Sequence, residues 1–167
     1  MPLYNFIQAA DQGVAFVERW LAIALTAVLT GIMMAQVILR YFFSAPLFWA
    51  EEVAVQLLVF MTLIGLSLLV RGDALIKIDL LSRLLPPKGQ RVLSLVLGLL
   101  FLGLLGFLAW LGWEWVQRPE ARLEMSATTQ LPRWYNYAVL PATVLAMAFH
   151  QFAWLLREAA ALKGARA

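Results

Sequence analysis

Four long apolar segments constrain the fold of this chain more than any other feature of its sequence. A helix that crosses a membrane needs about 20 mostly apolar residues. Such segments run from about residue 20 to 43, 47 to 70, 92 to 116 and 135 to 156. Tryptophan and tyrosine, which favour the headgroup level, mark several of their ends. The sequence therefore predicts an all-α integral membrane protein with four transmembrane helices in a single domain, residues 1–167.

The composition agrees with this class and excludes several functions. Of the 167 residues, 63% are hydrophobic and 14% are charged, whereas soluble domains hold about 45–50% apolar and about 25% charged residues. The absence of cysteine excludes disulfides and thiolate chemistry. No phosphate-binding loop, catalytic triad or metal-ligand spacing occurs. We therefore expect no enzyme and assign no catalytic, cofactor-binding or metal-binding residue.

The single histidine, His150, is expected to form hydrogen bonds at the membrane interface or between helices rather than to bind a cofactor. One histidine cannot supply both ligands of a haem with two histidine ligands. The net charge of +3 reflects basic residues in short loops, which we interpret as a topology signal rather than a nucleic-acid surface.

The distribution of these basic residues predicts the orientation in the membrane. Nine of the 13 lysines and arginines lie in segments on the same side as the N-terminus, and four lie on the other side. Because basic loops remain in the cytoplasm, both termini are expected there. The N-terminal residues lack the basic start of a cleaved signal peptide, so the first span is expected to remain in the mature protein.

The segment between the second and third spans, about residues 73–85, is apolar but too short to cross a membrane. On a helix with about 100° per residue, its apolar residues form two stripes. These stripes, which are candidate contacts to another subunit, contain Ile78, Leu81 and Leu85 on one side and Ile76 and Leu80 on the other. Two stripes predict an amphipathic helix that lies at the membrane surface and touches both lipid and protein. A connector with one helical turn is the alternative.

Charged residues flank the turn between the first two spans, in the stretch "RYFFSAPLFWAEEV". A tight turn is predicted here: Ser44 would cap the second helix, and Pro46 would lie in the first turn of that helix. Counting from that turn places Arg40 at about the depth of Glu51 and Glu52. We expect Arg40 to hold one glutamate in a structural clasp, while the other contacts a neighbouring subunit. Ion or proton handling is a less favoured alternative. The clasp also includes the glutamines that share a helix face with these charges, Gln36 and Gln56.

Residues 40–87 resemble the small membrane subunit of tripartite ATP-independent periplasmic (TRAP) transporters, the DctQ family. The resemblance depends on the order of several short motifs: an Arg-Tyr pair at Arg40, Trp-x-Glu-Glu at 49–52, Gly65, Arg71, an Ile-x-x-Asp element at 76–79 and Leu-Pro at 85–86. Residues 126–142, "SATTQLPRWYNYAVLPA", resemble the family's entry to the fourth span. The family often has a histidine where this sequence has Leu75, so no role for that histidine carries over.

The resemblance implies an accessory subunit of a sodium-driven importer of organic acids in the bacterial inner membrane. In such transporters a periplasmic binding protein captures the substrate, and a large membrane subunit holds the substrate and sodium sites. This chain would hold no cofactor, support the large subunit within the bilayer and meet the binding protein transiently. The candidate contacts to the binding protein come from the polar outer loop: Arg118, Arg122, Glu124, Arg133 and Trp134.

Two hypotheses from other classes remain open. A small autonomous proton-coupled exporter, acting as a homodimer, would need a titrating carboxylate, for which Glu51 and Glu52 are the candidates. A membrane redox subunit would show visible absorption, and the presence of a single histidine argues against its haem form.

Overall fold

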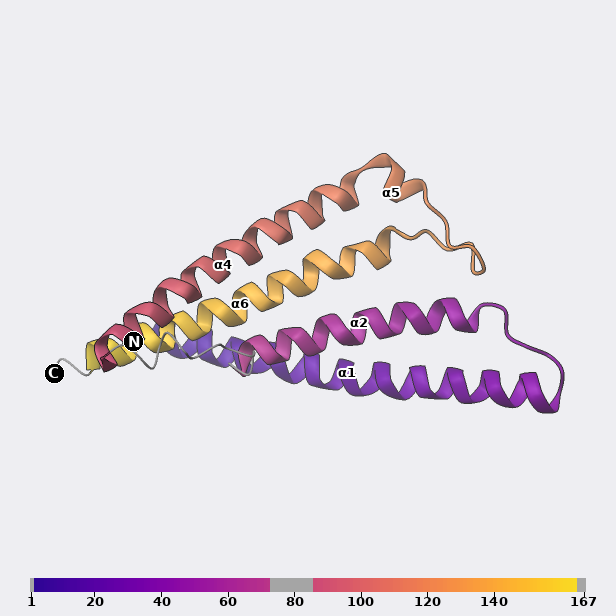
Figure 1. Cartoon of the computed structure of the whole chain (residues 1–167), viewed down its shortest axis with the longest axis horizontal. Coiled ribbons are helices and arrows are strands. Elements are labelled where there is room, and N and C mark those ends of the chain that lie inside the picture. Colours follow the sequence, from indigo (N-terminus) through magenta and orange to yellow (C-terminus); the bar gives the residue numbers. More distant parts are fainter. Residues whose placement is uncertain (1, 73–85, 165–167) are drawn as a thin grey trace.

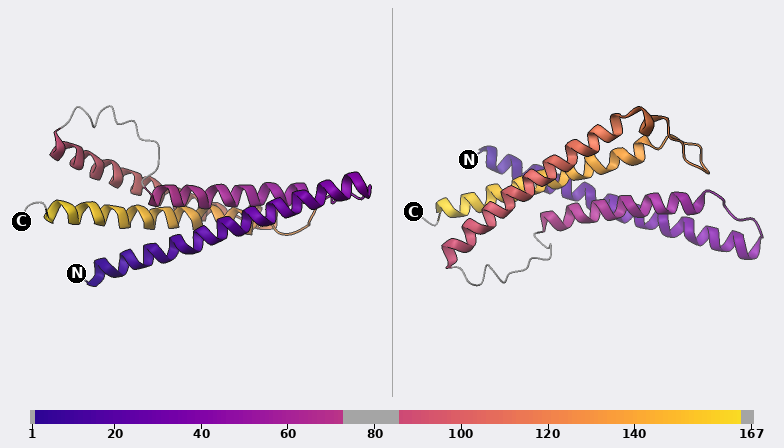
Figure 2. Two further views of the ribbon diagram at one scale, coloured as in Figure 1. Left: turned by 90° about the horizontal axis from the view of Figure 1, so that it is seen from below. Right: turned by 45° about the horizontal axis from the view of Figure 1, so that its top comes forward.

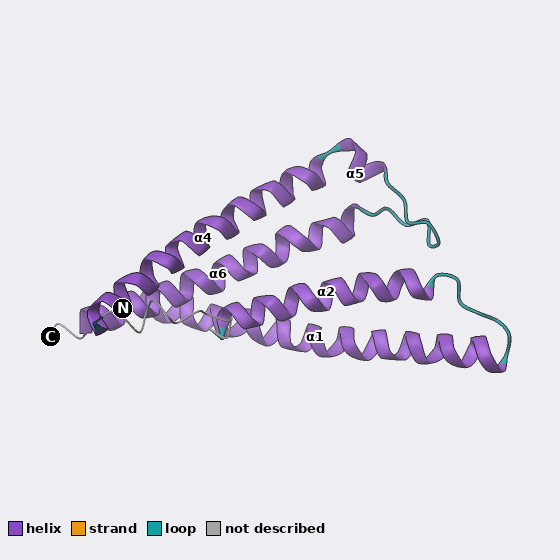
Figure 3. Cartoon of the chain, in the orientation of Figure 1, coloured by secondary structure: helices purple, strands orange, loops and turns teal. Residues whose placement is uncertain are grey.

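The computed structural model describes residues 2–72 and 86–164, and within these ranges it contains helices and no strand. The elements are α1 (Pro2–Phe42), α2 (Ala50–Arg71), α4 (Pro87–Gln117), α5 (Pro119–Leu123) and α6 (Trp134–Gly164) (Figures 1 and 3). Four of them, α1, α2, α4 and α6, are long and apolar enough to cross a membrane. The predicted all-α class with four spans is thus confirmed. The predicted amphipathic helix at 73–85, with Ile76, Ile78, Leu80, Leu81 and Leu85, lies outside the described residues.

Helix α1 is much longer than the predicted first span. Its 41 residues correspond to about 60 Å, about twice the thickness of the hydrocarbon core. The additional N-terminal turns carry Asp11 and Glu18, and both side chains are buried against other helices. The helix therefore begins well before the apolar run because these turns are stabilised by tertiary contacts.

The connection between α1 and α2 is longer than the predicted tight turn. Helix α2 begins at Ala50, after an N-cap at Trp49 that makes no side-chain capping hydrogen bond. Ser44 adopts a positive φ of 51° instead of capping the helix, so the predicted cap is wrong. The consequence is a seven-residue connection, 43–49, and α1 extends past the start of α2 (Figure 1).

The spans form two antiparallel pairs that meet along α6. Helix α1 packs against α2, α4 packs against α6, and α6 also contacts both α1 and α2. Within the described residues, α4 makes no such contact with α1 or α2. The pairs approach each other at the end that carries both termini and diverge toward the end that carries α5 (Figures 1 and 2).

A small apolar core lies along α6, with side chains from both α2 and α4. It consists of Val70, Leu105, Ala109, Val144 and Met147. Most other large apolar side chains remain exposed, as expected for helices surrounded by lipid or by another membrane protein. In the most apolar 18-residue stretch of each helix, only 6% of the residues of α1 are buried, against 33% of those of α6. Helix α6 is thus the central helix, and α1 leaves the most surface available.

Two glycines on α4 allow it to approach α6 closely. A Cβ atom at Gly98 would lie 2.8 Å from the ring of Trp154 and 3.0 Å from the side chains of Gln151 and Leu155. A Cβ atom at Gly112 would lie 3.3 Å from Pro141, which is fully buried inside α6. Small residues at such positions permit close packing of helices in lipid. The contact thereby accommodates a proline within a spanning helix.

Candidate functional site

Two polar clusters connect the helical pairs, one at each end of the molecule. The first, which we call the terminal cluster, lies near the chain termini and centres on His150 of α6. Its ring Nδ1 is 2.6 Å from Oδ1 of Asp11, and its Nε2 is 3.1 Å from Oε2 of Glu18. His150 and Asp11 are fully buried, and Glu18 is 6% exposed. Of the two predicted roles of His150, interfacial and interhelical, the geometry shows the interhelical one, with two acids of α1 as partners.

Side chains from α2 and α6 complete the terminal cluster. Ser67 donates a hydrogen bond of 2.6 Å to Glu18. Arg71 and Arg157 approach Oδ2 of Asp11 at 3.0 and 3.4 Å. The Asp11 carboxylate thus faces two guanidinium groups, which reduces the cost of burying this acid. Both arginines are about one third exposed, so each guanidinium contacts solvent as well as the buried Asp11 carboxylate.

The geometry of His150 requires an additional proton in this cluster. A neutral imidazole has one N–H donor and one bare nitrogen. A bare nitrogen facing an ionised carboxylate at either distance would be repulsive. The three groups are therefore satisfied when the imidazole carries both protons or when one carboxyl is protonated. Histidine and the two acids hold this proton as a unit.

Sequence reasoning missed this cluster, although a periodic signal was present. Asp11 and Glu18 are seven residues apart, and so are His150 and Arg157. On a helix, a spacing of seven returns to nearly the same face. Both acids precede the first predicted span, which begins at about residue 20, so hydropathy gives no reason to match their common face with that of the histidine.

The second cluster, which we call the loop clasp, lies at the opposite end and centres on Glu52 in the first turn of α2. One carboxylate oxygen accepts from the hydroxyl of Ser126 and, at 3.3 Å, from the backbone N–H of Ala127. The other accepts from the hydroxyl of Thr128 and, at 2.9 Å, from its backbone N–H. Arg133 lies 3.6 Å away. Glu52 thereby joins α2 to the loop that leads into α6.

That loop has its own internal bonds. Arg133 donates to Oε1 of Glu124 at 2.8 Å, and the Tyr137 hydroxyl donates to Oε2 at 2.6 Å. An isolated bridge pairs Met125 with Pro132. The hydrogen bond from Tyr137, together with the nearby Arg133 guanidinium, lowers the pKa of Glu124 below its usual 4.5. Glu124 is thus held ionised and fixes the two ends of the loop.

The predicted clasp between Arg40 and a glutamate does not form. Arg40 and Glu51 are exposed, and neither makes an ion pair with any residue that the structure describes. The prediction assumed a tight turn with both helix ends at one depth, whereas α1 extends past the start of α2 (Figure 1). Gln36 is buried and accepts from the Leu47 backbone N–H at 2.7 Å. Gln56 is half-buried and, among the described residues, makes no hydrogen bond to Glu52.

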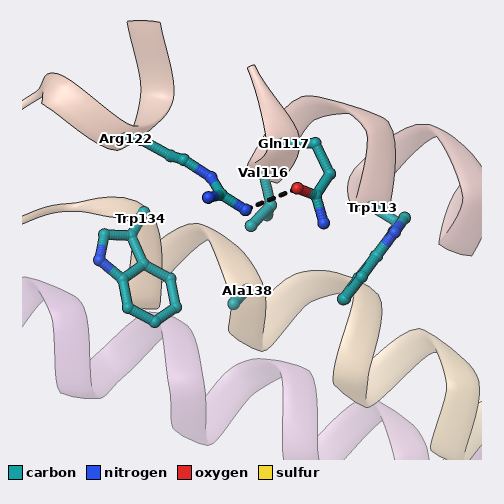
Figure 4. Close-up of a pocket in the computed structure, with 6 residues that line it drawn as sticks. All are labelled: Trp113, Val116, Gln117, Arg122, Trp134 and Ala138. Carbon is teal, nitrogen blue, oxygen red and sulfur yellow. Dashed lines mark hydrogen bonds between the residues drawn. The ribbon is translucent and has the colours of Figure 1, made fainter. Parts of the chain in front are cut away.

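The five residues predicted to meet a periplasmic partner take different positions. Glu124 and Arg133 bind each other within the loop. Arg118 lies 3.5 Å from Glu114 and stacks over the ring of Trp115. Arg122 and Trp134 line a pocket beside α4 (Figure 4). No group of His, Cys, Asp or Glu suited to a metal occurs in the ranges that the structure describes.

The fold and these clusters define a class. The chain is a multi-pass α-helical membrane protein whose buried charges bind one another and join its helices. The comparisons then identify the family. A model described as the DctQ component of tripartite ATP-independent periplasmic transporters matches residues 29–161, and the chain belongs to this family. Because its members are transporter subunits, the expectation that the chain is not an enzyme is confirmed.

Individual relatives agree with this assignment. The chain is 29% identical over 135 residues to the sialic acid TRAP transporter small permease protein SiaQ of Vibrio cholerae, covering 81% of this chain and 77% of the relative. It is 27% identical to the C4-dicarboxylate TRAP transporter small permease protein DctQ of the same organism, covering 83% and 70%. A third match, 39% identical over 71 residues, is to the sialic acid TRAP transporter permease protein SiaT of Haemophilus influenzae. It covers 42% of this chain and only 12% of that protein.

Proposed function

We propose that this chain is the accessory membrane subunit of a TRAP importer for an organic acid, and that it forms a rigid support for a large permease subunit. The observation that carries the proposal is the pair of polar clusters within a DctQ-family chain. Their charges bind one another and hold the helices together. Because these charged side chains already bind one another, they are not available to bind a transported substrate.

The match to SiaT supports a large membrane partner. A segment similar to part of this chain makes up 12% of that permease. A related stretch is therefore built into a much longer membrane protein, which is the covalent equivalent of the association we propose. The exposed apolar surface of α1 offers area for such a partner. Exposed Glu51 remains our candidate polar contact to the large subunit. Glu52 is a weaker candidate, because both of its carboxylate oxygens already accept hydrogen bonds from the loop.

The remaining features of the proposal follow from the family and its relatives. The names of the three relatives refer to sialic acid and C4-dicarboxylates, which favours a carboxylic acid substrate. Coupling to sodium, with its site in the large subunit, is part of the proposal. So are the bacterial inner membrane and cytoplasmic termini, which the excess of basic residues on that side supports.

In this orientation the loop clasp faces the periplasm. Glu52 fixes the loop at 126–128, while Glu124 and Arg133 close its base. A loop held in one conformation loses less entropy on binding than a mobile one. We propose that this ordered loop helps to dock the substrate-binding protein.

Uptake into proteoliposomes tests the proposal. Vesicles would contain this chain alone, the large permease alone or both, with the binding protein outside and an inward sodium gradient. Labelled sialic acid and C4-dicarboxylates are suitable first substrates. We expect uptake only when both membrane proteins are present. Transport by this chain alone would contradict the proposal and favour the autonomous exporter.

A further inference from the structure

A pocket lies at the junction of α4, α5 and α6, outside both polar clusters. Its volume is about 350 Å³, and it is lined by Trp113, Val116, Gln117, Arg122, Trp134 and Ala138 (Figure 4). Trp113 and Gln117 belong to the last turns of α4, and Trp134 is the first residue of α6. The pocket is therefore at the ends of two spanning helices, where the hydrocarbon meets the headgroups.

The cation of this pocket, Arg122, has no acidic partner among the residues that the structure describes. Arg122 donates to the Gln117 side chain at 2.6 Å, and this bond holds its guanidinium beside the pocket (Figure 4). No carboxylate of the described residues lies within ion-pair distance of Arg122. The other two arginines of this loop differ, since Arg118 is paired with Glu114 and Arg133 with Glu124. The remaining N–H donors of Arg122 are available to an anion.

The rest of the lining is apolar and open to the membrane. The indoles of Trp113 and Trp134 are 57% and 45% exposed, and Val116 is buried at the base. Exposed apolar side chains continue along α4 from this level, including Trp110 and Phe107. A ligand that suits this arrangement has a compact anion at one end and a long apolar chain at the other.

We propose that this pocket binds a membrane phospholipid. The phosphate binds the guanidinium of Arg122, whose planar group can form two parallel hydrogen bonds to phosphate oxygens. An acyl chain lies against the indoles and continues along the exposed face of α4. A docking surface for the binding protein would instead be expected to present its polar groups away from the bilayer.

A matched pair of arginine variants tests the site. The full chain, purified in mild detergent and stripped of lipid, would be titrated with phosphatidylglycerol and followed by native mass spectrometry. We expect Arg122→Gln to weaken binding about tenfold or more, as for loss of a charge-assisted hydrogen bond. Arg118→Gln removes the same charge from the same loop and should stay within about twofold, because Arg118 is already paired. Both arginines are exposed, and thermal unfolding would verify that both variants fold.

Several outcomes would overturn the site. Equal losses in the two variants would indicate a general charge effect, and an unchanged Arg122→Gln variant would leave the pocket without a phosphate contact. Competition by inorganic phosphate alone would indicate a site for a free anion. Unchanged lipid binding combined with weaker capture of the binding protein would assign Arg122 to protein docking.

Discussion

At the scale of single residues, Asp11 contacts more ionisable side chains of the terminal cluster than any other member. It is fully buried and faces His150, Arg71 and Arg157. Removing its carboxylate leaves Nδ1 of His150 and the Arg71 guanidinium without their acidic partner. The loss of one partner from a buried ion pair costs about 3–5 kcal/mol. We therefore expect Asp11→Ala to destabilise the purified protein by about that amount, measured by unfolding in mixed micelles.

The matched control for Asp11→Ala is an acid that makes no ion pair among the described residues. Glu51 is exposed and unpaired among the described residues, so Glu51→Ala should change the free energy of unfolding by less than about 0.5 kcal/mol. Similar losses for the two variants would show that the terminal cluster contributes no more than a surface acid.

Glu124 provides a test of electrostatics in the outer loop. Its pKa is lowered from 4.5 chiefly by the Tyr137 hydroxyl and then by Arg133. A group with a lowered folded pKa stabilises the fold at pH values above its usual pKa, and this contribution disappears as the pH falls through the folded value. The loop contacts of Glu124 are therefore expected to persist at neutral pH and to weaken in acid, below 4.5.

A carboxyl NMR titration of Glu124 would check this expectation. Tyr137→Phe removes the largest cause, so the midpoint should move upward toward 4.5. Tyr135→Phe makes the same chemical change two residues away, at a side chain that contacts Trp134 instead, and should leave the midpoint in place. An unshifted midpoint in Tyr137→Phe would mean that the hydroxyl does not bind the carboxylate.

At the scale of elements, the packing of α4 on α6 depends on Gly98. An added Cβ would meet three side chains of α6 at 2.8–3.0 Å, and overpacking of this kind costs about 1–3 kcal/mol. Gly103 lies on the same helix with open space around it. Gly103→Ala should therefore be neutral or stabilise by up to about 1 kcal/mol, since alanine favours helix more than glycine does.

Thermal unfolding of the two alanine variants separates packing from helix propensity. We expect a lower midpoint for Gly98→Ala and an equal or higher midpoint for Gly103→Ala. If both glycines respond alike, α4 and α6 are not in close contact at Gly98.

The loop clasp makes a prediction about the distance between the two helical pairs. Glu52 receives donors on both oxygens, whereas glutamine would direct an NH₂ group toward some of those donors. Glu52→Gln should therefore release the loop, and Glu51→Gln should not. Because the chain has no cysteine, spin labels can be placed uniquely at the exposed positions Phe42 and Leu123.

Pulsed electron resonance between these labels would report the separation of α1 from α5. We expect a narrow distance distribution in the parent and in Glu51→Gln, and a broader one in Glu52→Gln. Three superimposable distributions would show that Glu52 does not hold the pairs together.

Hydropathy identified the four spans because lipid imposes one simple requirement on each of them. It could not locate the start of α1, since the turns around Asp11 and Glu18 are stabilised by contacts with α6 and α2. Counting residues from the turn gave the wrong depth for Arg40 relative to Glu51 and Glu52, because the count assumed a tight turn where the chain uses seven residues. The partners of Glu52 lie 74 residues away at Ser126, a separation that local patterns do not encode.

At the scale of the whole molecule, the clusters at the two ends explain why sequence motifs far apart belong together. Glu52 comes from the motif that opens α2, and Ser126 comes from the motif that leads into α6. Arg71, which closes α2, reaches Asp11 at the opposite end. The charged residues of this small chain thus join its two helical pairs into one support, whose least covered helix is α1.

We propose above that this support serves a large TRAP permease. Native mass spectrometry of the tagged chain, extracted from its own membranes in mild detergent, tests it most directly. We expect a complex that contains this chain and a large TRAP permease. A homodimer of this chain, without any other membrane protein, would contradict it.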